Sequence, residues 1–348
     1  MAKEMQAPIL IIGGGPAGMA AAVELADLGQ ESLIVEKEPQ LGGLAVGMAC
    51  KATDKCARCG VCLADDLIAD TAGTDLIETR TETVLAGLSS GDAGFEAVLK
   101  DSSGREEKRI VAGVVAALGA APIDPALKSQ FGYGIIDNVV SGLELERMVR
   151  QDQAVRRPSD GKRPGRVGFV QCVGSRDISV GGGKGGFTGC SRICCGYTAR
   201  LADWIAAYQP GTELTVFYMD LQSVGRDPAG LLARLKEKVE FVRAVPGHVN
   251  RGADGAVKLQ FKPEFEPGLE EREVDLLVLS TGLTGPRTGA VLREGLGLEV
   301  DGDGFFTAPG PGRVLVAGAA GGPLGIAESV RQGRAAGRRA AEWRGGSR

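Results

Sequence analysis

Short apolar runs that end at glycine or at polar residues dominate the pattern of the chain. Residues 8–12 (Pro-Ile-Leu-Ile-Ile) form such a run and stop at a glycine, which is typical of a buried parallel strand. The alanine-rich stretch 16–29 predicts a helix with Gly29 at its end, and residues 32–36 predict a second strand. Together these segments predict a βαβ unit at the N-terminus.

The rest of the chain continues the alternation of strands and helices. Residues 44–80 read as irregular and then helical, and residues 94–120 predict the strands of a meander. Two polar or glycine-rich stretches, 151–165 and 181–189, predict a surface loop and a flexible tract. Later apolar runs predict four strands and a closing helix, at 166–171, 214–218, 275–280, 314–317 and 326–343. This order of elements predicts an α/β fold.

Length, charge and cysteine content narrow the class of protein. The 348 residues suggest two domains, and a net charge of −4 argues against a nucleic-acid partner. We see no run of 18 apolar residues and no secretory signal, so we expect a cytoplasmic protein without a transmembrane segment. In a reducing compartment, eight cysteines favour metal binding or redox chemistry over disulfides, and His248 is the one histidine.

A glycine-rich turn at the first strand–helix junction has the spacing of a dinucleotide site. Gly13 permits the tight turn, Gly15 lets the backbone approach a pyrophosphate, and Gly18 allows close packing of helix and strand. The start of the helix offers free N–H groups to the phosphates. Glu36 ends the next strand, where an acidic side chain can accept from ribose hydroxyls.

Three further segments distinguish FAD from NAD. Leu41-Gly42-Gly43 resembles the glycine pair that follows the ribose-binding acid in two-dinucleotide-domain flavoproteins. Residues 117–122 and 314–320 resemble the two later FAD segments of that superfamily, although Ala319 replaces the usual aspartate. The helix that begins near Ile326 would direct its positive end at the flavin.

The resemblance implies a thioredoxin-reductase-like fold with a split FAD domain, residues 1–122 and 266–348. Residues 123–265 would form an inserted, degenerate nucleotide-binding-like domain. Its strand at 167–175 lacks the glycine motif and carries Cys172, so we do not expect a conventional NAD(P)H site. The predicted FAD-binding residues are Gly13, Gly15, Pro16, Ala17, Gly18, Glu36, Lys37, Gly42, Gly43, Val84, Gly119, Gly318 and Ile326.

The first four cysteines, Cys50, Cys56, Cys59 and Cys62, lie within one short segment. Two of their gaps are of the Cys-x-x-Cys type found in ferredoxins, and four thiolates suffice for one cubane iron–sulfur cluster. Three basic residues in the segment lower the cost of gathering thiolates, namely Lys51, Lys55 and Arg58. A structural zinc site and a redox dithiol are the alternatives.

The other four cysteines are Cys172, Cys190, Cys194 and Cys195. They occur in Gln-Cys-Val-Gly-Ser-Arg-Asp (171–177) and Cys-Ser-Arg-Ile-Cys-Cys (190–195), strings that closely resemble HdrA, the iron–sulfur flavoprotein of heterodisulfide reductases. The resemblance implies that these four residues ligate a [4Fe–4S] cluster near the flavin; four buried structural cysteines are the alternative. The appended ferredoxin domains of methanogen members have no counterpart, so we expect a short form.

These features predict an oxidoreductase: an electron-transfer subunit that passes electrons between FAD and the cluster in sulfur, thiol/disulfide or quinone-linked metabolism. The family resemblance implies HdrB- and HdrC-like partner subunits and a homodimer. A stand-alone NAD(P)H-dependent disulfide reductase and a zinc-stabilised flavoprotein scaffold are the alternatives. We also expect Arg176 and Asp177 to pair, and the arginines of the last helix to form one face, solvated or covered by a partner: Arg331, Arg334, Arg338 and Arg339.

Overall fold

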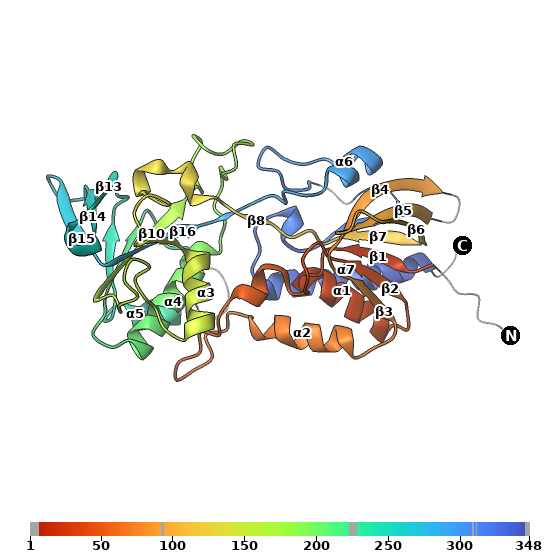
Figure 1. The fold of residues 1–348 in the computed structure, drawn as a ribbon, viewed down its shortest axis with the longest axis horizontal. Helices are drawn as coiled ribbons and strands as arrows, with labels where there is room; N and C mark the ends of the chain where they lie inside the picture. The colour runs from red at the N-terminus through yellow and green to blue at the C-terminus, as the bar shows by residue number, and fades with distance from the viewer. Residues whose placement is uncertain (1–6, 92–93, 223–227, 308–309, 311, 345–348) are drawn as a thin grey trace. The chain divides into compact units, whose positions relative to one another are not determined.

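The computed structural model describes residues 7–91, 94–222, 228–307, 310 and 312–344 (Figure 1). Its contacts divide the chain into two compact units. The first unit comprises residues 1–46, 60–121 and 285–348, and the second comprises residues 47–59 and 122–284. The second unit therefore interrupts the first, in the manner of an inserted domain.

The first unit is built on a five-stranded parallel sheet with the strand order β18-β7-β1-β2-β3. The strands are β1 (Ile9–Ile12), β2 (Ser32–Val35), β3 (Ile77–Arg80), β7 (Gly113–Ala116) and β18 (Val314–Val316). The helices of this unit are α1 (Pro16–Asp27), α2 (Cys62–Ala72), α6 (Ala290–Leu296) and α7 (Ile326–Ala341). A separate antiparallel sheet contains β4 (Thr83–Gly91), β5 (Gly94–Asp101) and β6 (Glu106–Val111).

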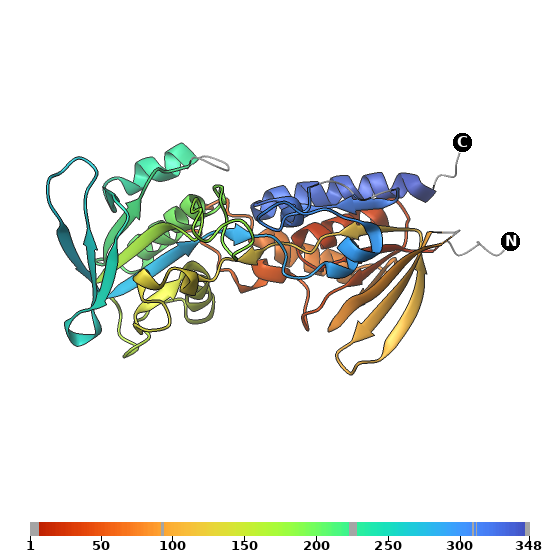
Figure 2. The same ribbon diagram turned by 90° about the horizontal axis from the view of Figure 1, so that it is seen from above.

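Both faces of this parallel sheet are buried, which explains why its strands are apolar throughout. Ile9 and Ile11 pack with the helices α1, α2 and α7, whereas Leu10 and Ile12 pack with the β4–β6 layer (Figure 2). Successive side chains of a strand point to opposite faces, so a strand covered on both sides reads as an unbroken apolar run.

The second unit repeats this plan with different sequences. Its five-stranded parallel sheet has the order β12-β11-β10-β16-β9. The strands are β9 (Val139–Ser141), β10 (Arg166–Val173), β11 (Glu213–Tyr218), β12 (Glu240–Arg243) and β16 (Leu276–Thr281). The helices are α3 (Gly142–Asp152), α4 (Cys194–Tyr208) and α5 (Pro228–Leu235), and an antiparallel layer contains β13 (His248–Arg251), β14 (Val257–Phe261) and β15 (Glu270–Val274).

The core of the second unit again lies on both faces of the sheet. Val167 and Phe169 pack with the helices, whereas Val170 and Phe217 pack with the β13–β15 layer. Each unit therefore has the layers expected of a dinucleotide-binding domain, a parallel sheet between helices and a small antiparallel sheet.

The structure confirms the predicted βαβ unit and the α/β class, and it corrects several details. Within the predicted meander 94–120, β5 and β6 are antiparallel, but β7 joins the parallel sheet. The sequence did not predict β3, β4 or the β13–β15 layer. The predicted return to the first domain at residue 266 differs from the observed return at Gly285, because β16 lies in the middle of the second sheet.

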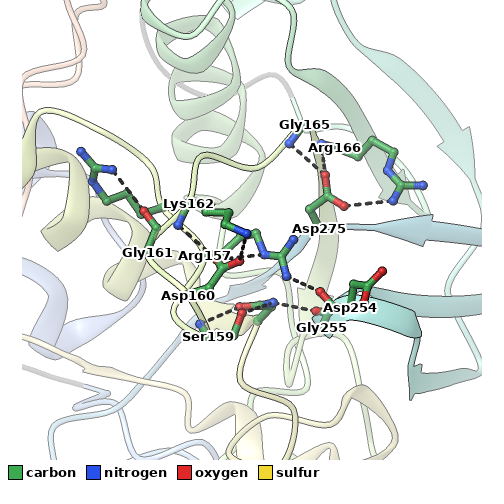
Figure 3. Close-up of polar contacts among 12 residues, drawn as sticks. Arg157, Ser159, Asp160, Gly161, Lys162, Gly165, Arg166, Asp254, Gly255 and Asp275 are labelled. Carbon is green, nitrogen blue, oxygen red and sulfur yellow. Dashed lines mark hydrogen bonds and ion pairs between the residues drawn. The ribbon is translucent and has the colours of Figure 1, made fainter.

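The polar stretch 151–165 is a loop, as predicted, but hydrogen bonds hold its backbone in place (Figure 3). The carboxylate of Asp275 accepts from the amides of Gly165 and Arg166, at 2.8 and 2.9 Å, and from the Arg166 guanidinium at 2.9 Å. Asn138 donates to the Ser159 hydroxyl and to the Gly255 carbonyl. The loop is therefore fixed to the strands that flank it.

Two glycines allow the helices α1 and α7 to pack closely. A Cβ atom added at Gly333 would overlap the carbonyl oxygen of Ala17, and one at Gly337 would lie 3.1 Å from Glu24 Cβ. The predicted arginine face of α7 is partly used within the unit. Arg338 donates to the buried Glu24 carboxylate at 2.5 Å, and Arg334 lies 3.5 Å from it.

The glycine-rich tract 181–189 is anchored at its start by an ion pair. Lys128 Nζ lies 2.5 Å from the Asp177 carboxylate, which also accepts from the amide and hydroxyl of Ser179. The hydrogen bond from Lys128, followed by those from Ser179, lowers the pKa of Asp177 from 3.8 to about 2. Asp177 thus pairs with Lys128, and the predicted pair with Arg176 is wrong.

Gly333→Ala should destabilise the chain, because the added methyl group forces α7 away from α1. We expect a loss of about 1–3 kcal/mol in the free energy of unfolding, measured by urea denaturation. Gly302→Ala is the control, since nothing lies within 4 Å of the Cβ position at Gly302. Equal stability of the two variants would contradict the packing account.

Asp177→Asn should cost about 1 kcal/mol near neutral pH, where the Asp177 carboxylate is ionised and paired. A depressed pKa in the folded state stabilises above the unfolded value, so the difference from wild type should shrink as pH falls from about 4 towards 2. Glu96→Gln removes an exposed ion pair with Lys108 and should have little effect. Unfolding curves across pH measure both, and a pH-independent difference would reject the ion pair as the cause.

Candidate functional site

The turn between β1 and α1 needs glycine for steric reasons. Gly13 has φ +104°, and a Cβ there would overlap the carbonyl oxygen of Ala117. A Cβ at Gly18 would overlap the carbonyl oxygen of Gly13, so this glycine lets the helix lie against the strand end. Gly15 is the extended N-cap residue, and Pro16 opens the helix. The predicted roles of the three glycines therefore match the backbone geometry.

The same turn leaves space where a phosphate would approach. Nothing lies within 4 Å of the Cβ position at Gly15. The amide groups of the first helical turn have no partners within a helix, and α1 carries no acidic residue in that turn. An anion can therefore approach the positive end of the helix without competition from a side-chain carboxylate.

Glu36 is held in a fixed orientation beside the turn. Its carboxylate accepts from the amide of Gly14 at 2.7 Å and from the amide of Glu38 at 2.9 Å, and it is 5% exposed. A carboxylate offers about four lone pairs, so two remain for other donors. The next strand starts here too, because the amide of Thr83 donates to the Glu36 carbonyl at 2.9 Å.

The glycine pair after β2 folds back onto the turn. The amide of Gly42 donates to the Gly14 carbonyl at 2.8 Å, and the Cβ position of Gly43 lies 3.2 Å from the Cα of Gly15. Both glycines have positive φ, +111° and +55°. These contacts bring Gly42 and Gly43 to the predicted phosphate site.

The remaining predicted FAD residues fall into two sets. Gly318 meets α1, since a Cβ there would lie 2.5 Å from the Ala17 Cβ, and Gly119 follows the Ala117 contact with φ +71°. Lys37 and Val84 are both exposed, and Lys37 pairs with Glu38 at 3.1 Å. The expectation that these two side chains contact FAD therefore rests on the sequence alone.

The C-terminal segment provides polar groups that the sequence analysis missed. The amide of Gly318 donates to Gln332 Oε1 at 3.1 Å. Ile326 is the first residue of α7, and the Glu328 carboxylate accepts from the Gly325 amide at 3.1 Å to cap it. Gln332 therefore supplies a side-chain oxygen in the segment where the usual aspartate is Ala319. A glutamine one helical turn beyond a capping Glu was the available signal.

In the second unit, cysteines stand at the corresponding strand–helix junction. β10 ends at Cys172-Val173, and α4 starts at Cys194-Cys195 after the loop 174–193. The strand and helix are followed by the parallel neighbour β11, as α1 is followed by β2. The thiols thus take the place at the sheet edge and helix N-terminus where a dinucleotide phosphate would bind.

The four thiols lie near one another. Burial, and then the charges of Cys195 and Cys190, raise the pKa of Cys172 to about 11. Burial and the charges of Cys172, Cys195 and Cys190 raise the pKa of Cys194 well above its ordinary value. Such a group of thiols resists ionisation until a cation compensates the charge, and binding of a metal centre would release the protons.

Backbone groups also face these sulfur atoms. The amide of Arg192 donates to Cys190 Sγ at 3.4 Å, and the amide of Gln222 donates to Cys195 Sγ at 3.5 Å. Cys172 and Arg192 both have φ +60°, a left-handed conformation that turns amides into the loop. These donors would stabilise thiolates at the start of α4.

Two serines fix the loop on the sheet. The hydroxyls of Ser175 and Ser191 lie 2.7 Å apart, and the amide of Leu283 donates to Ser191 Oγ at 3.0 Å. A Cβ at Gly282 would overlap both hydroxyl groups. The loop therefore presents its cysteines from a supported backbone.

Arg176 lies close enough to this group to act on its charge, and its partner is Asp220 rather than Asp177. The guanidinium lies 2.5 Å from the Asp220 carboxylate, and its charge opposes the rise in the pKa of Cys172. Asp220 and Gln222 follow the end of β11, beside the end of β10. The sequence signal was their position after a predicted strand, because carboxyl ends of adjacent parallel strands meet at one edge.

The first cysteine group is distributed differently. Cys50, Cys56 and Cys59 belong to the second unit, and Cys62 begins α2 in the first unit. Cys50, Cys56 and Cys62 are exposed. Among the described residues, the structure contains no group of three Cys, His, Asp or Glu side chains arranged to hold a single metal ion.

Comparison with known sequences adds family information. Residues 8–83 match the family model of FAD dependent oxidoreductases. The chain is 31% identical over 422 residues to HdrA, the iron-sulfur subunit of CoB–CoM heterodisulfide reductase, from Methanocaldococcus jannaschii, covering 96% of this chain and 64% of the relative. It is 29% identical to the corresponding subunit of the H(2):CoB-CoM heterodisulfide,ferredoxin reductase of Methanothermobacter marburgensis, covering 95% of this chain and 63% of the relative.

Comparison with solved structures identifies the fold. The structure matches thioredoxin reductases from T. acidophilum, with a TM-score of 0.61 and 17% identity, and from Lactococcus lactis, with 0.62 and 16%. Each match covers 97% of this chain and 99% of the other. The fold is therefore the two-dinucleotide-binding, thioredoxin-reductase-like fold that the sequence predicted.

Two further results limit what these matches mean. Within the described part of the chain, no helix has the length and apolar character needed to cross a membrane. The chain spans a little under two thirds of the length of these curated relatives. Over that part of their length, the matches confirm the predicted resemblance, and the chain belongs to the HdrA family of heterodisulfide reductase proteins.

Proposed function

We propose that the chain is an oxidoreductase subunit that transfers electrons between FAD and a [4Fe–4S] cluster. The observation that carries this proposal is the exchange at the second strand–helix junction. Where the first unit has a glycine turn with room for a pyrophosphate, the second has Cys172, Cys190, Cys194 and Cys195. When bound, FAD would take up or release two electrons and the cluster would carry them singly.

The first unit would hold the FAD through the residues predicted for it. The backbone of Gly13, Gly15 and the start of α1 would receive the pyrophosphate, and Glu36 would accept from the ribose. What supports this is the open space at Gly15 and the fixed Glu36 carboxylate. Gly318, Gln332 and the N-terminus of α7 would contact the rest of the cofactor.

The second unit would ligate the cluster through its four grouped thiols. The amides of Arg192 and Gln222 already donate to two of the sulfur atoms, and Arg176 supplies a nearby positive charge. Deprotonation on cluster assembly would remove the burial penalty that keeps Cys172 and Cys194 protonated. The donor set therefore fits an iron–sulfur centre in charge and in number.

We infer that the chain works in a larger assembly. Its relatives are named as subunits of heterodisulfide reductases, which supports HdrB- and HdrC-like partners and chemistry on thiols, disulfides or sulfane sulfur. A homodimer is part of the same proposal and rests on the family resemblance alone.

A stand-alone NAD(P)H-dependent disulfide reductase is the second candidate. The thioredoxin-reductase-like fold favours it, because the matched enzymes of that fold are reductases. The cysteine loop 174–193 argues against it, since it replaces the glycine turn that an NAD(P)H phosphate would need.

Glu36→Gln should weaken FAD binding. The charged acceptor beside the turn is lost, and a hydrogen bond to a charged group contributes roughly 1.5–3 kcal/mol, or about a 10- to 100-fold rise in the FAD Kd. Flavin fluorescence during titration of the deflavinated protein measures it. Glu38→Gln is the matched control, since Glu38 is exposed and pairs with Lys37. Unchanged affinity in Glu36→Gln would remove Glu36 from the site.

Cys194→Ser should remove about four irons per chain and keep the flavin, because one cubane cluster needs all four thiolates. Iron and acid-labile sulfide in anaerobically purified protein, together with the visible spectrum, measure this outcome. Wild-type protein without iron, combined with rapid bleaching of its flavin by NADPH, would reject the proposal in favour of the disulfide reductase.

A further inference from the structure

The segment 47–59, which carries Cys50, Cys56 and Cys59, is fixed to the second unit by a buried ion pair. Lys51 Nζ lies 2.6 and 2.7 Å from the two carboxylate oxygens of Glu146 on α3, and 2.8 Å from the Ala49 carbonyl. Glu146 also accepts from the amide of Ala49 at 3.1 Å. Lys51 is 2% exposed and Glu146 is 4% exposed. A fully buried Lys–Glu pair is costly unless its geometry is good, so it locks the backbone next to Cys50.

Three more side chains of the unit hold this segment by its carbonyl groups. Arg150 donates to Met48 at 3.0 Å, and Tyr208 donates to Ala52 at 3.1 Å. Arg200 donates through Nε to the Ala57 carbonyl at 2.9 Å. An otherwise irregular segment is thus attached at both ends and in the middle, far more firmly than a solvated linker requires.

The turn at Cys56 has the same hydrogen bond as the turn at Cys190. The amide of Arg58 donates to Cys56 Sγ at 3.4 Å, and the amide of Arg192 donates to Cys190 Sγ at 3.4 Å. Both arginines are left-handed, with φ +51° and +60°. Successive backbone amides in such a conformation form concavities that bind anions and are found at iron–sulfur sites. Two cysteine turns of one unit therefore share one sulfur-binding geometry.

This geometry separates a metal–thiolate turn from a thioredoxin-type dithiol. A redox dithiol of that type places its first cysteine at a helix N-terminus, whereas residues 56–60 are not helical. Cys56-x-x-Cys59 here lies in an extended turn that ends at Gly60 with φ +81°. The alternatives left open by the spacing are therefore reduced to a metal centre.

Arg200 connects this turn to the helix that begins with the other cysteines. Its guanidinium lies 3.0 Å from the Cβ position of Gly196, the residue after Cys195, while its Nε reaches Ala57. Burial lowers the pKa of Arg200, and the charge of Cys59 opposes that shift. The same cation therefore lies beside Cys59 and beside the first turn of α4.

We propose that the segment 47–59 carries a second iron–sulfur cluster, with Cys56 and Cys59 among its ligands and Arg200 as the positioning residue that ties it to α4. The inference rests on the proposed function, because it adds a second one-electron carrier to the first. Iron–sulfur is favoured over zinc because zinc has no redox chemistry, and a buried cation shared with the helix of the first cluster serves electron transfer.

The iron content of wild-type protein tests the proposal without any variant. Anaerobically purified protein should contain about eight irons and about eight sulfides per chain. About four irons, all lost in Cys194→Ser, would keep the proposed function and overturn the second cluster. Zinc bound in place of the additional iron would overturn it equally.

Cys59→Ser should lose half of the iron while it retains FAD and the cluster that depends on Cys194. Cys194→Ser should lose the other half, which makes the two variants reciprocal controls. Cys56→Ser provides an independent variant of the same turn. Iron that is unchanged in both Cys56→Ser and Cys59→Ser would overturn the proposal.

Arg200→Gln tests the positioning role by potential rather than by activity. Loss of the positive charge should lower the reduction potential of the cluster that depends on Cys59, measured by potentiometric titration with EPR detection. Arg200→Lys should restore most of the shift. Arg150→Gln is the matched control, since it removes another carbonyl contact of the segment. An equal shift in Arg150→Gln, or no shift in Arg200→Gln, would reject Arg200 as the positioning residue.

Discussion

Both units depend on one constraint of parallel sheets, which is that a strand leading into a helix leaves amide groups unpaired at the carboxyl edge. Those amides and the helix dipole favour negative charge. In the first unit the chain meets them with glycine, and space remains at Gly15 for a phosphate. In the second unit it meets them with cysteine, and thiolates take the role of the anion. The same backbone solution thus serves two kinds of cofactor.

The loop that carries the cysteines shows how the second solution is supported. Burial makes thiolates costly at Cys172 and Cys194, as the direction of their pKa shifts indicates. Amide donors and Arg176 offset part of that cost, and the paired hydroxyls of Ser175 and Ser191 hold the loop. A metal centre would complete the compensation. The site is therefore organised around charge rather than around a nucleotide.

Local sequence was sufficient for the parts of the fold that short-range chemistry determines. The glycine turn, Glu36 and the grouping of Cys190 with Cys194 and Cys195 follow from spacing within a few residues. Contacts between distant residues could not be predicted in this way. Lys51 and Glu146 pair across 95 residues, and β16 joins its sheet far from β10 in sequence. The domain boundary differed from the prediction for the same reason.

A reductive titration of anaerobic protein tests the central claim most directly, because it counts electrons rather than atoms. FAD accepts about two electrons, and each cubane cluster accepts about one more. The account predicts more than two electrons per chain, with an EPR signal of a reduced iron–sulfur cluster alongside flavin bleaching. Uptake of only two electrons, with no cluster signal, would contradict the account.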